Sequence, residues 1–136
     1  MVFGCKEVPF AQYREHVAAV ARAQIAITFS CRYAMIGNDD DSDNYYVFLV
    51  PDVGFSEISK LHDKLYRGPL APHLRLDIPY IPHIGIATIP DAARIKNLCD
   101  QLNAKPVTIH GQINAITLCS YDGSKVTDLE SFPCQT

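Results

Sequence analysis

Residues 81–87 read Ile-Pro-His-Ile-Gly-Ile-Ala, a histidine set in an alternating apolar run. Successive side chains of a strand point to opposite faces, so this period is typical of a strand with one face on a core. Ile84 and Ile86 are expected to face that core, while His83, Gly85 and Ala87 face a more open side. A titratable ring beside a residue without a side chain predicts a binding groove there. The alternative is a histidine with a purely structural hydrogen bond.

The overall composition is that of an ordinary globular protein. The chain has 136 residues, 48% hydrophobic and 20% charged, with a net charge of −3, which fits a single domain over residues 1–136. No apolar run reaches the ~20 residues of a membrane span, and no secretory signal opens the chain. The acidic balance excludes a bulk nucleic-acid binder but allows recognition of a single phosphate. We expect a cytoplasmic protein.

The cysteines favour no metal or redox site. They are five in number and widely spaced, and none forms a C-x-x-C pair, so zinc and thioredoxin-like sites are disfavoured. Reduced thiols in a cytosol are expected, with two of them packed in the core as small hydrophobic groups. The five are Cys5, Cys31, Cys99, Cys119 and Cys134, of which Cys31 and Cys99 occupy the core-like positions.

The hydrophobic pattern predicts an α+β fold with mostly antiparallel strands and helices on one side. Proline and glycine mark the ends of the elements, and a long Pro-rich connection over 69–82 is typical of a functional loop. The expected elements are a strand end over 2–5, a helix over 9–23 with Pro9 as its first residue, a hairpin of strands over 25–31 and 45–50, a helix capped by Ser56 and stopped at Gly68, the strand with His83, a helix opening at Pro90 and Asp91, and strands over about 107–120 and 125–132.

The order of two short motifs resembles a known family. Residues 61–66 read Leu-His-Asp-Lys-Leu-Tyr, and after a long loop residues 79–87 read Pro-Tyr-Ile-Pro-His-Ile-Gly-Ile-Ala, followed by a helix and two strands. This is similar to the 2H phosphoesterase superfamily, in its 2′-5′ RNA ligase (LigT-like) branch, where a helix reading L-H-x-x-L precedes a strand reading P-H-x-[ST]. The resemblance covers nearly all of the chain. It implies two similar lobes, each offering one H-x-[ST] motif to a central groove.

The resemblance also implies a chemistry. Such proteins hydrolyse 2′,3′-cyclic phosphates or 2′-5′ linkages, or join RNA ends in the reverse direction, without a metal or other cofactor. One imidazole acts as a base and its partner protonates the leaving ribose oxygen, which suits a group with a pKa of ~6.5. The Ser or Thr hydroxyls stabilise the phosphoryl oxygens. His83 is thereby implied as one member of the pair, and an RNA end or cyclic nucleotide phosphate as the partner molecule.

Gly85 departs from the family pattern, because it stands where the family has Ser or Thr. A backbone N–H or a water in place of the hydroxyl would cost about 1–3 kcal/mol of transition-state stabilisation. Thr88 is not expected to replace it, because five residues along an ideal strand turn a side chain to the opposite face.

A second departure is that no other H-x-[ST] occurs in the chain. The remaining histidines fall on helices, in a loop, or in the sequence His-Gly-Gln, and His62 is expected to be a surface or packing residue. They are His16, His62, His73 and His110. We expect Met1 to follow directly after a missing first motif, which would leave the domain N-terminally incomplete and without its first strands. An upstream reading frame that encodes no such motif within about a dozen codons would contradict this.

Several other residues are candidates for substrate contact. Tyr80 precedes the histidine strand and could stack on a nucleobase or pack at the rim. Arg75 and Lys6 are candidate phosphate contacts, although a solvated surface position is the usual place for such residues. Gly85 is the candidate for a backbone donor to phosphate.

A calcium loop is a weaker hypothesis. Asp39, Asp41 and Asp43 have the right spacing, but Asn44 replaces the turn glycine and Val50 stands where a bidentate Glu is needed. A solvated hairpin turn is therefore expected.

Three function classes remain open at this level. The leading one is a phosphodiesterase or 2′-5′ RNA ligase-like enzyme that acts on RNA ends or cyclic nucleotides through His83. The second is a binding module that keeps the groove without the chemistry. The third is a structural protein whose open strand edge and exposed apolar surface promote a homodimer.

Overall fold

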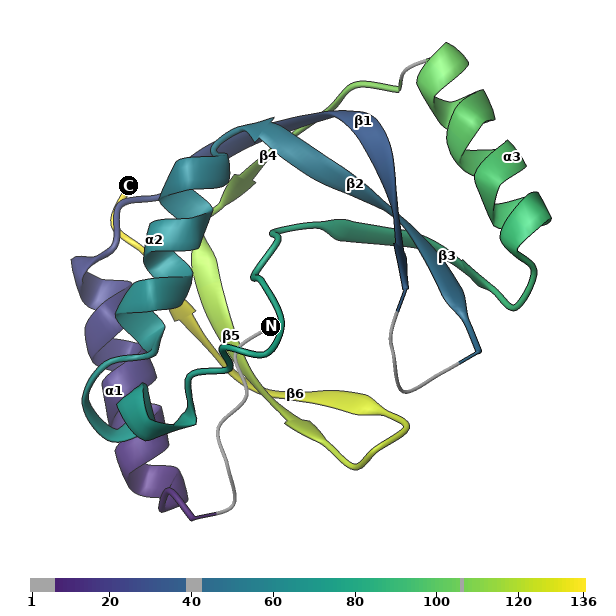
Figure 1. Cartoon of the computed structure of the whole chain (residues 1–136). Helices are drawn as coiled ribbons and strands as arrows, with labels where there is room; N and C mark the ends of the chain where they lie inside the picture. Colours follow the sequence, from purple (N-terminus) through teal and green to yellow (C-terminus); the bar gives the residue numbers. More distant parts are fainter. Residues whose placement is uncertain (1–6, 39–42, 106) are drawn as a thin grey trace. The chain divides into compact units, whose positions relative to one another are not determined.

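The computed structural model describes residues 7–38, 43–105 and 107–136 and confirms the α+β class (Figure 1). The described residues divide into two compact units. Unit 1 is drawn from Met1–Ile27, Ser56–Pro79 and Gln112–Thr136, and unit 2 from Thr28–Phe55 and Tyr80–Gly111. The elements in chain order are α1 (Phe10–Ala23), β1 (Ile27–Asn38), β2 (Tyr45–Val53), α2 (Phe55–Leu65), the 3-10 helix η1 (Gly68–His73), β3 (Ile84–Ile89), α3 (Ala92–Ala104), β4 (Ile109–Ile113), β5 (Ala115–Tyr121) and β6 (Val126–Pro133).

Unit 1 is built from α1, α2 and the antiparallel β5–β6 hairpin. Its core is formed by apolar side chains at helical spacing on the two helices, together with the first residue of β1 and one residue from each strand of the hairpin. The helices are also joined by a polar contact, since the Nε2–H of His16 on α1 donates to the carbonyl of Leu65, the last residue of α2, over 2.9 Å. The buried core residues are Val17, Ala18, Ala21, Ile27, Leu61, Leu65, Leu118 and Phe132.

Unit 2 contains the strand that follows His83. The sheet has the order β3-β2-β1-β4, and the β1–β2 and β2–β3 pairs are antiparallel. Helix α3 covers one face of this sheet (Figure 1), where Ile95 and Cys99 pack against side chains of β1 and β2. Cys31 and Cys99 are buried free thiols in this core, as the sequence predicts. The buried members of the core are Cys31, Ala34, Val47, Leu49, Ile95 and Cys99.

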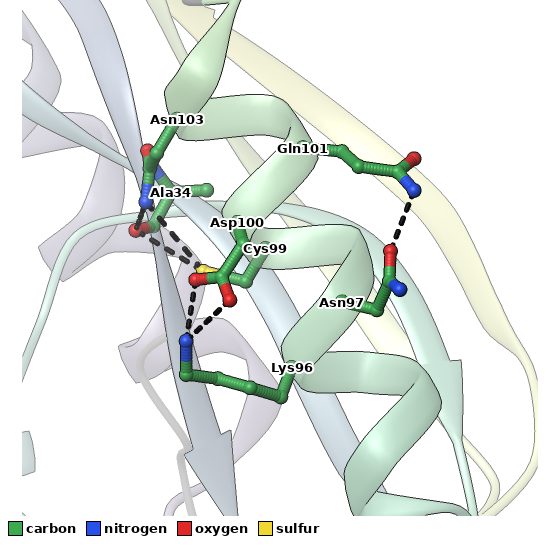
Figure 2. Close-up of polar contacts among 7 residues, drawn as sticks. All are labelled: Ala34, Lys96, Asn97, Cys99, Asp100, Gln101 and Asn103. Carbon is green, nitrogen blue, oxygen red and sulfur yellow. Dashed lines mark hydrogen bonds and ion pairs between the residues drawn. The ribbon is translucent and has the colours of Figure 1, made fainter.

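Helix α3 is fixed at both ends by polar side chains. Asp91 caps its N-terminus by accepting from the backbone N–H groups of Ala93 and Arg94 at 2.9 and 3.0 Å. Near its C-terminus, the amide of Asn103 accepts from the N–H of Ala34 at 2.8 Å and donates to the carbonyl of Ala34 at 3.0 Å (Figure 2). These are the two bonds that a neighbouring strand would make, so Asn103 occupies part of the β1 edge.

Both long pairings in this sheet are irregular, with two register shifts between β1 and β2 and one between β2 and β3. In the β2–β3 pair, Val47 lies opposite Ala87 while Phe48 lies opposite Gly85, so Ile86 is the extra residue. The expectation that Ile86 faces the core with Ile84 is therefore wrong: Ile86 is 43% exposed, and Ala87 packs on the core beside Ile84 instead. An extra residue shifts the alternation by one position, which exchanges the faces of all residues beyond it.

Most predicted elements are present, with corrections at their ends. Pro9 is the residue before α1 rather than its first residue, and Ser56 lies inside α2 rather than before it. The single strand expected over 107–120 is two strands, because β4 joins the sheet of β1 while β5 pairs with β6. The strand end expected over 2–5, together with Cys5, Lys6, Asp39 and Asp41, lies outside the described residues.

Within the described ranges, none of the helices is long and apolar enough to span a membrane.

Candidate functional site

His83 lies exposed in unit 2, one residue before β3 begins. Its Nδ1 is 2.7 Å from the backbone carbonyl of Ile81. Because a carbonyl can only accept, Nδ1 must carry the proton, which leaves the lone pair of the neutral ring on Nε2. Among the described residues, Nε2 has no hydrogen-bond partner. The local backbone thus selects the tautomer and leaves the other nitrogen ready to accept a proton from a bound molecule.

An aromatic ring supports the imidazole from the middle of the sheet. The ring centroids of Phe48 on β2 and His83 are 4.8 Å apart, with a tilt of 43° between their planes. Val47 and Leu49, the neighbours of Phe48 on its strand, both belong to the core under α3. Alternation places Phe48 on the opposite face of the sheet. His83 therefore stands on the face away from α3, as the sequence predicts.

Gly85 lies opposite Phe48 in the β2–β3 pair and occupies the same open face. A Cβ built on Gly85 meets no atom of the described residues within 4 Å. The glycine is therefore not required by packing, and a small side chain at this position would point into open space. In this chain the position offers no hydroxyl, so only backbone groups can contact a ligand there.

The bulge also corrects the expectation for Thr88. Since Ile84, Ala87 and Ile89 all pack on the core under α3, Gly85 and Thr88 share the opposite face. The register places Thr88 across from Tyr46, further along β3 than Gly85. The hydroxyl of Thr88 is thus on the same face as His83, although it does not occupy the position two residues after the histidine.

The other residues predicted to contact a substrate do not all belong to unit 2. Tyr80 belongs to unit 2 and is half-buried, and burial raises the pKa of its phenol. Arg75 belongs to unit 1, where its Nε donates to Asp77 at 3.1 Å in an ion pair that lowers the pKa of that carboxyl. Lys6 lies outside the described residues. The suggested roles of Tyr80 and Arg75 in substrate contact stay predictions.

One polar pair in unit 2 has no local signal in the sequence. The Oγ of Ser30 on β1 is 2.8 Å from the Nδ1 of His110 on β4. Ser30 is only 8% exposed whereas His110 is exposed. The two residues are 80 positions apart, so only the pairing of β4 in the sheet of β1 brings them together.

His62, in the Leu-His-x-x-Leu stretch, is a packing residue in unit 1. It is buried on α2, its ring meets that of Tyr66 edge-on with centroids 4.9 Å apart, and its Nδ1 lies 3.1 Å from Asp63. This confirms the packing role, while a surface position for His62 is wrong. In residues 7–38, 43–105 and 107–136, no group of three His, Cys, Asp or Glu side chains is arranged to hold a metal ion.

The geometry around His83 suits proton transfer. An exposed imidazole with a fixed tautomer can take a proton at Nε2 from a water or hydroxyl, or return one to a leaving oxygen. The open space over Gly85, on the same face of the sheet as the ring, gives a ligand room. The arrangement therefore fits one half of an acid/base pair.

A family model described as the 2′-5′ RNA ligase superfamily matches residues 2–125. No curated protein matches the chain. The match covers both the helix with the Leu-His-x-x-Leu stretch and the strand that follows His83, in agreement with the α+β fold and its antiparallel strands. This chain belongs to the 2′-5′ RNA ligase superfamily.

Proposed function

We propose that this chain acts on 2′,3′-cyclic phosphate ends of RNA or on cyclic nucleotides, with His83 as one of two acid/base groups and without a metal. The observation that carries the proposal is the state of the His83 ring. It is exposed, its Nδ1–H is fixed on the carbonyl of Ile81, and its Nε2 faces away from that bond. Membership of the superfamily supports the choice of a phosphodiester as substrate.

The proposed step is a hydrolysis in which every atom has a destination. Nε2 of His83 takes a proton from water as the water oxygen attacks phosphorus, and the bond from phosphorus to one ribose oxygen breaks. That oxygen receives a proton from a second acid, and the product is a phosphate monoester. Run in reverse, the same steps join an RNA end.

The test is a turnover assay with a 2′,3′-cyclic nucleotide in the presence of a chelator. We expect hydrolysis by the unmodified chain and its loss, by at least about 100-fold, in His83→Ala, since general acid–base catalysis contributes about 10²–10⁴-fold. The matched control is His110→Ala, which removes another exposed histidine of the same unit. Equal turnover in His83→Ala and the unmodified chain would exclude the proposed role.

A binding module is the second candidate, and Gly85 is the observation that favours it. The position beside His83 lacks the hydroxyl that would stabilise a phosphoryl oxygen in the transition state. If the chain binds a cyclic nucleotide, detected by calorimetry, and does not hydrolyse it, the binding role stands and the enzymatic one fails. If it neither binds nor hydrolyses the nucleotide, both candidates fail.

Gly85→Ser provides a gain-of-function test. Within the part of the chain that the structure describes, a Cβ at this position meets no atom within 4 Å, so the serine is expected to fit without moving the strand. A new hydroxyl donor is worth about 1–3 kcal/mol, and we expect cyclic-nucleotide turnover to rise by about 5- to 150-fold. Gly85→Ala adds the carbon without the hydroxyl and is the control, so an equal effect of both variants would contradict this explanation.

A further inference from the structure

We propose that Phe48 is a positioning residue for His83, and that Gly37 is the position that allows Phe48 to act. Its kinetic consequence rests on the proposed function, whereas its structural consequence does not. The three residues come from three adjacent strand regions of unit 2: Gly37 from β1, Phe48 from β2, and His83 from the residue before β3.

His83 has two supports, and they act in different directions. The bond from Nδ1 to the carbonyl of Ile81 fixes one edge of the imidazole. It leaves the ring free to swing about that bond unless a second group limits the motion. The Phe48 ring, 4.8 Å away between centroids, is the group in that position. This separation lies within the range of about 4.5–7 Å for stabilising aromatic pairs, and the tilt of 43° lies between the offset-stacked and edge-to-face arrangements.

The Phe48 ring is in turn placed by the absence of a side chain at Gly37. A Cβ built on Gly37 would lie 2.5 Å from Cε1 and 3.2 Å from Cζ of Phe48. The backbone of Gly37 does not have a positive φ, so its conformation is open to any residue and glycine is required there only for space. The clash involves the far end of the Phe48 side chain, so a methyl group at Gly37 would turn that ring rather than distort the strand.

A comparison with Gly85 shows that the conflict between a Cβ and the Phe48 ring is specific to Gly37. Gly85 lies opposite Phe48 on the other neighbouring strand, yet a Cβ there meets none of the described residues within 4 Å, the Phe48 ring included. The Phe48 ring therefore depends on one neighbouring glycine and is independent of the other. Gly37→Ala becomes a way to displace the Phe48 ring from a position that does not touch His83.

The structural test is nuclear magnetic resonance of the histidine ring protons. The ring current of Phe48 should shift the Cε1–H and Cδ2–H resonances of His83, and the other four histidines serve as internal references. We expect Phe48→Leu and Gly37→Ala each to move the His83 resonances, and Phe48→Tyr, which keeps the ring, to leave them nearly in place. His83 resonances that are the same in all four proteins would overturn the proposal, whether or not the chain is an enzyme.

The kinetic test uses the non-additivity of the two positions. Phe48→Leu and Gly37→Ala should each lower kcat by about 2- to 10-fold with KM unchanged, the size expected for one aromatic pair. In the double variant, Gly37→Ala should add nothing, because leucine has no Cε1 for the new methyl group to meet.

Tyr45→Leu is the matched control, since it removes a ring from the opposite, core-packed face of the same strand. Loss of stability with kcat unchanged in Phe48→Leu would make Phe48 a packing residue only and would overturn the kinetic part. If the unmodified chain has no turnover but the resonances move as expected, the enzymatic function fails and the positioning role stands.

Discussion

Two glycines of unit 2 differ in what a methyl group would meet, and this predicts effects of different size on stability. Gly54 has φ +84°, and a Cβ there would lie 2.6 Å from the carbonyl oxygen of Thr28. Backbone strain and a backbone clash both oppose a side chain, so we expect Gly54→Ala to lower the free energy of unfolding by about 2–4 kcal/mol. Gly85→Ala, in open space, should change it by less than about 1 kcal/mol.

Urea unfolding measures both variants, with the midpoints compared at an unchanged m-value. Equal midpoints for the two glycine variants would contradict the explanation.

At the level of single residues, the sequence predicts the exposure of His83 but not the residues that surround it. The proline, the histidine and the alternation fix which face His83 occupies. Alternation does not predict the face of Ile86 correctly, because the bulge depends on the pairing with β2 and not on the residues of β3. The sequence does not predict Phe48 as a partner of His83, or Gly37 as a neighbour of Phe48, because both contacts join residues from separate parts of the chain.

Among the helices, α3 offers the clearest test of a sequence signal. The side chain of Asp91 accepts two backbone N–H groups of the first turn. Asp91→Ala leaves both donors without that acceptor and should destabilise the fold by about 1 kcal/mol. Asp91→Asn keeps a side-chain oxygen in the same place and should cost less. The measurement is the urea midpoint of each variant. A midpoint for Asp91→Asn as low as that for Asp91→Ala would contradict the capping role of Asp91.

Elements with strong local signals are predicted well from the sequence. Helices α1, α2 and α3 and strand β2 all appear near their expected positions, whereas β1 continues to Asn38 although the sequence predicts its end at Cys31. The prediction of a single strand over 107–120 is wrong, because these residues form one continuous run of strand formers in the sequence. The break between β4 and β5 is set by pairing, since β4 joins the sheet of β1 and β5 pairs with β6.

Across the whole molecule, the ionised carboxylates predict a loss of stability in acid. Hydrogen bonds from Arg32 lower the pKa of Asp52, bonds from Arg75 lower that of Asp77, and backbone N–H groups of Lys125 and Ser124 lower that of Asp122. A carboxyl with a lower pKa in the folded state stabilises the fold above its unfolded pKa of about 3.8. This contribution is lost as the pH falls through the folded value.

The measurement is the urea midpoint between pH 6 and pH 2. We expect a plateau at the upper end and a decline that begins near pH 4. Replacing all three residues by Asn should make the decline shallower, because neutral amides do not titrate in this range. A slope unchanged by the triple replacement would assign the acid sensitivity to other groups.

Local sequence patterns do not predict the division into two units. Unit 1 joins three separate stretches of the chain and unit 2 joins two. Helical and strand periods describe a face of one element, and they do not say which distant element covers it. The α+β class follows from the order of elements, whereas the grouping of α1 with β5 and β6 in one core emerges only from the folded chain.

The extra residue in β3 has a consequence for how this strand is aligned with others. Beyond Gly85, every side chain is displaced by one step relative to a regular strand. An alignment without a gap at Ile86 would pair core positions with solvent positions all the way to Ile89. A graft of the histidine stretch onto another scaffold must therefore include the bulge at Ile86, because without the bulge Thr88 would lie on the face of the sheet opposite to His83.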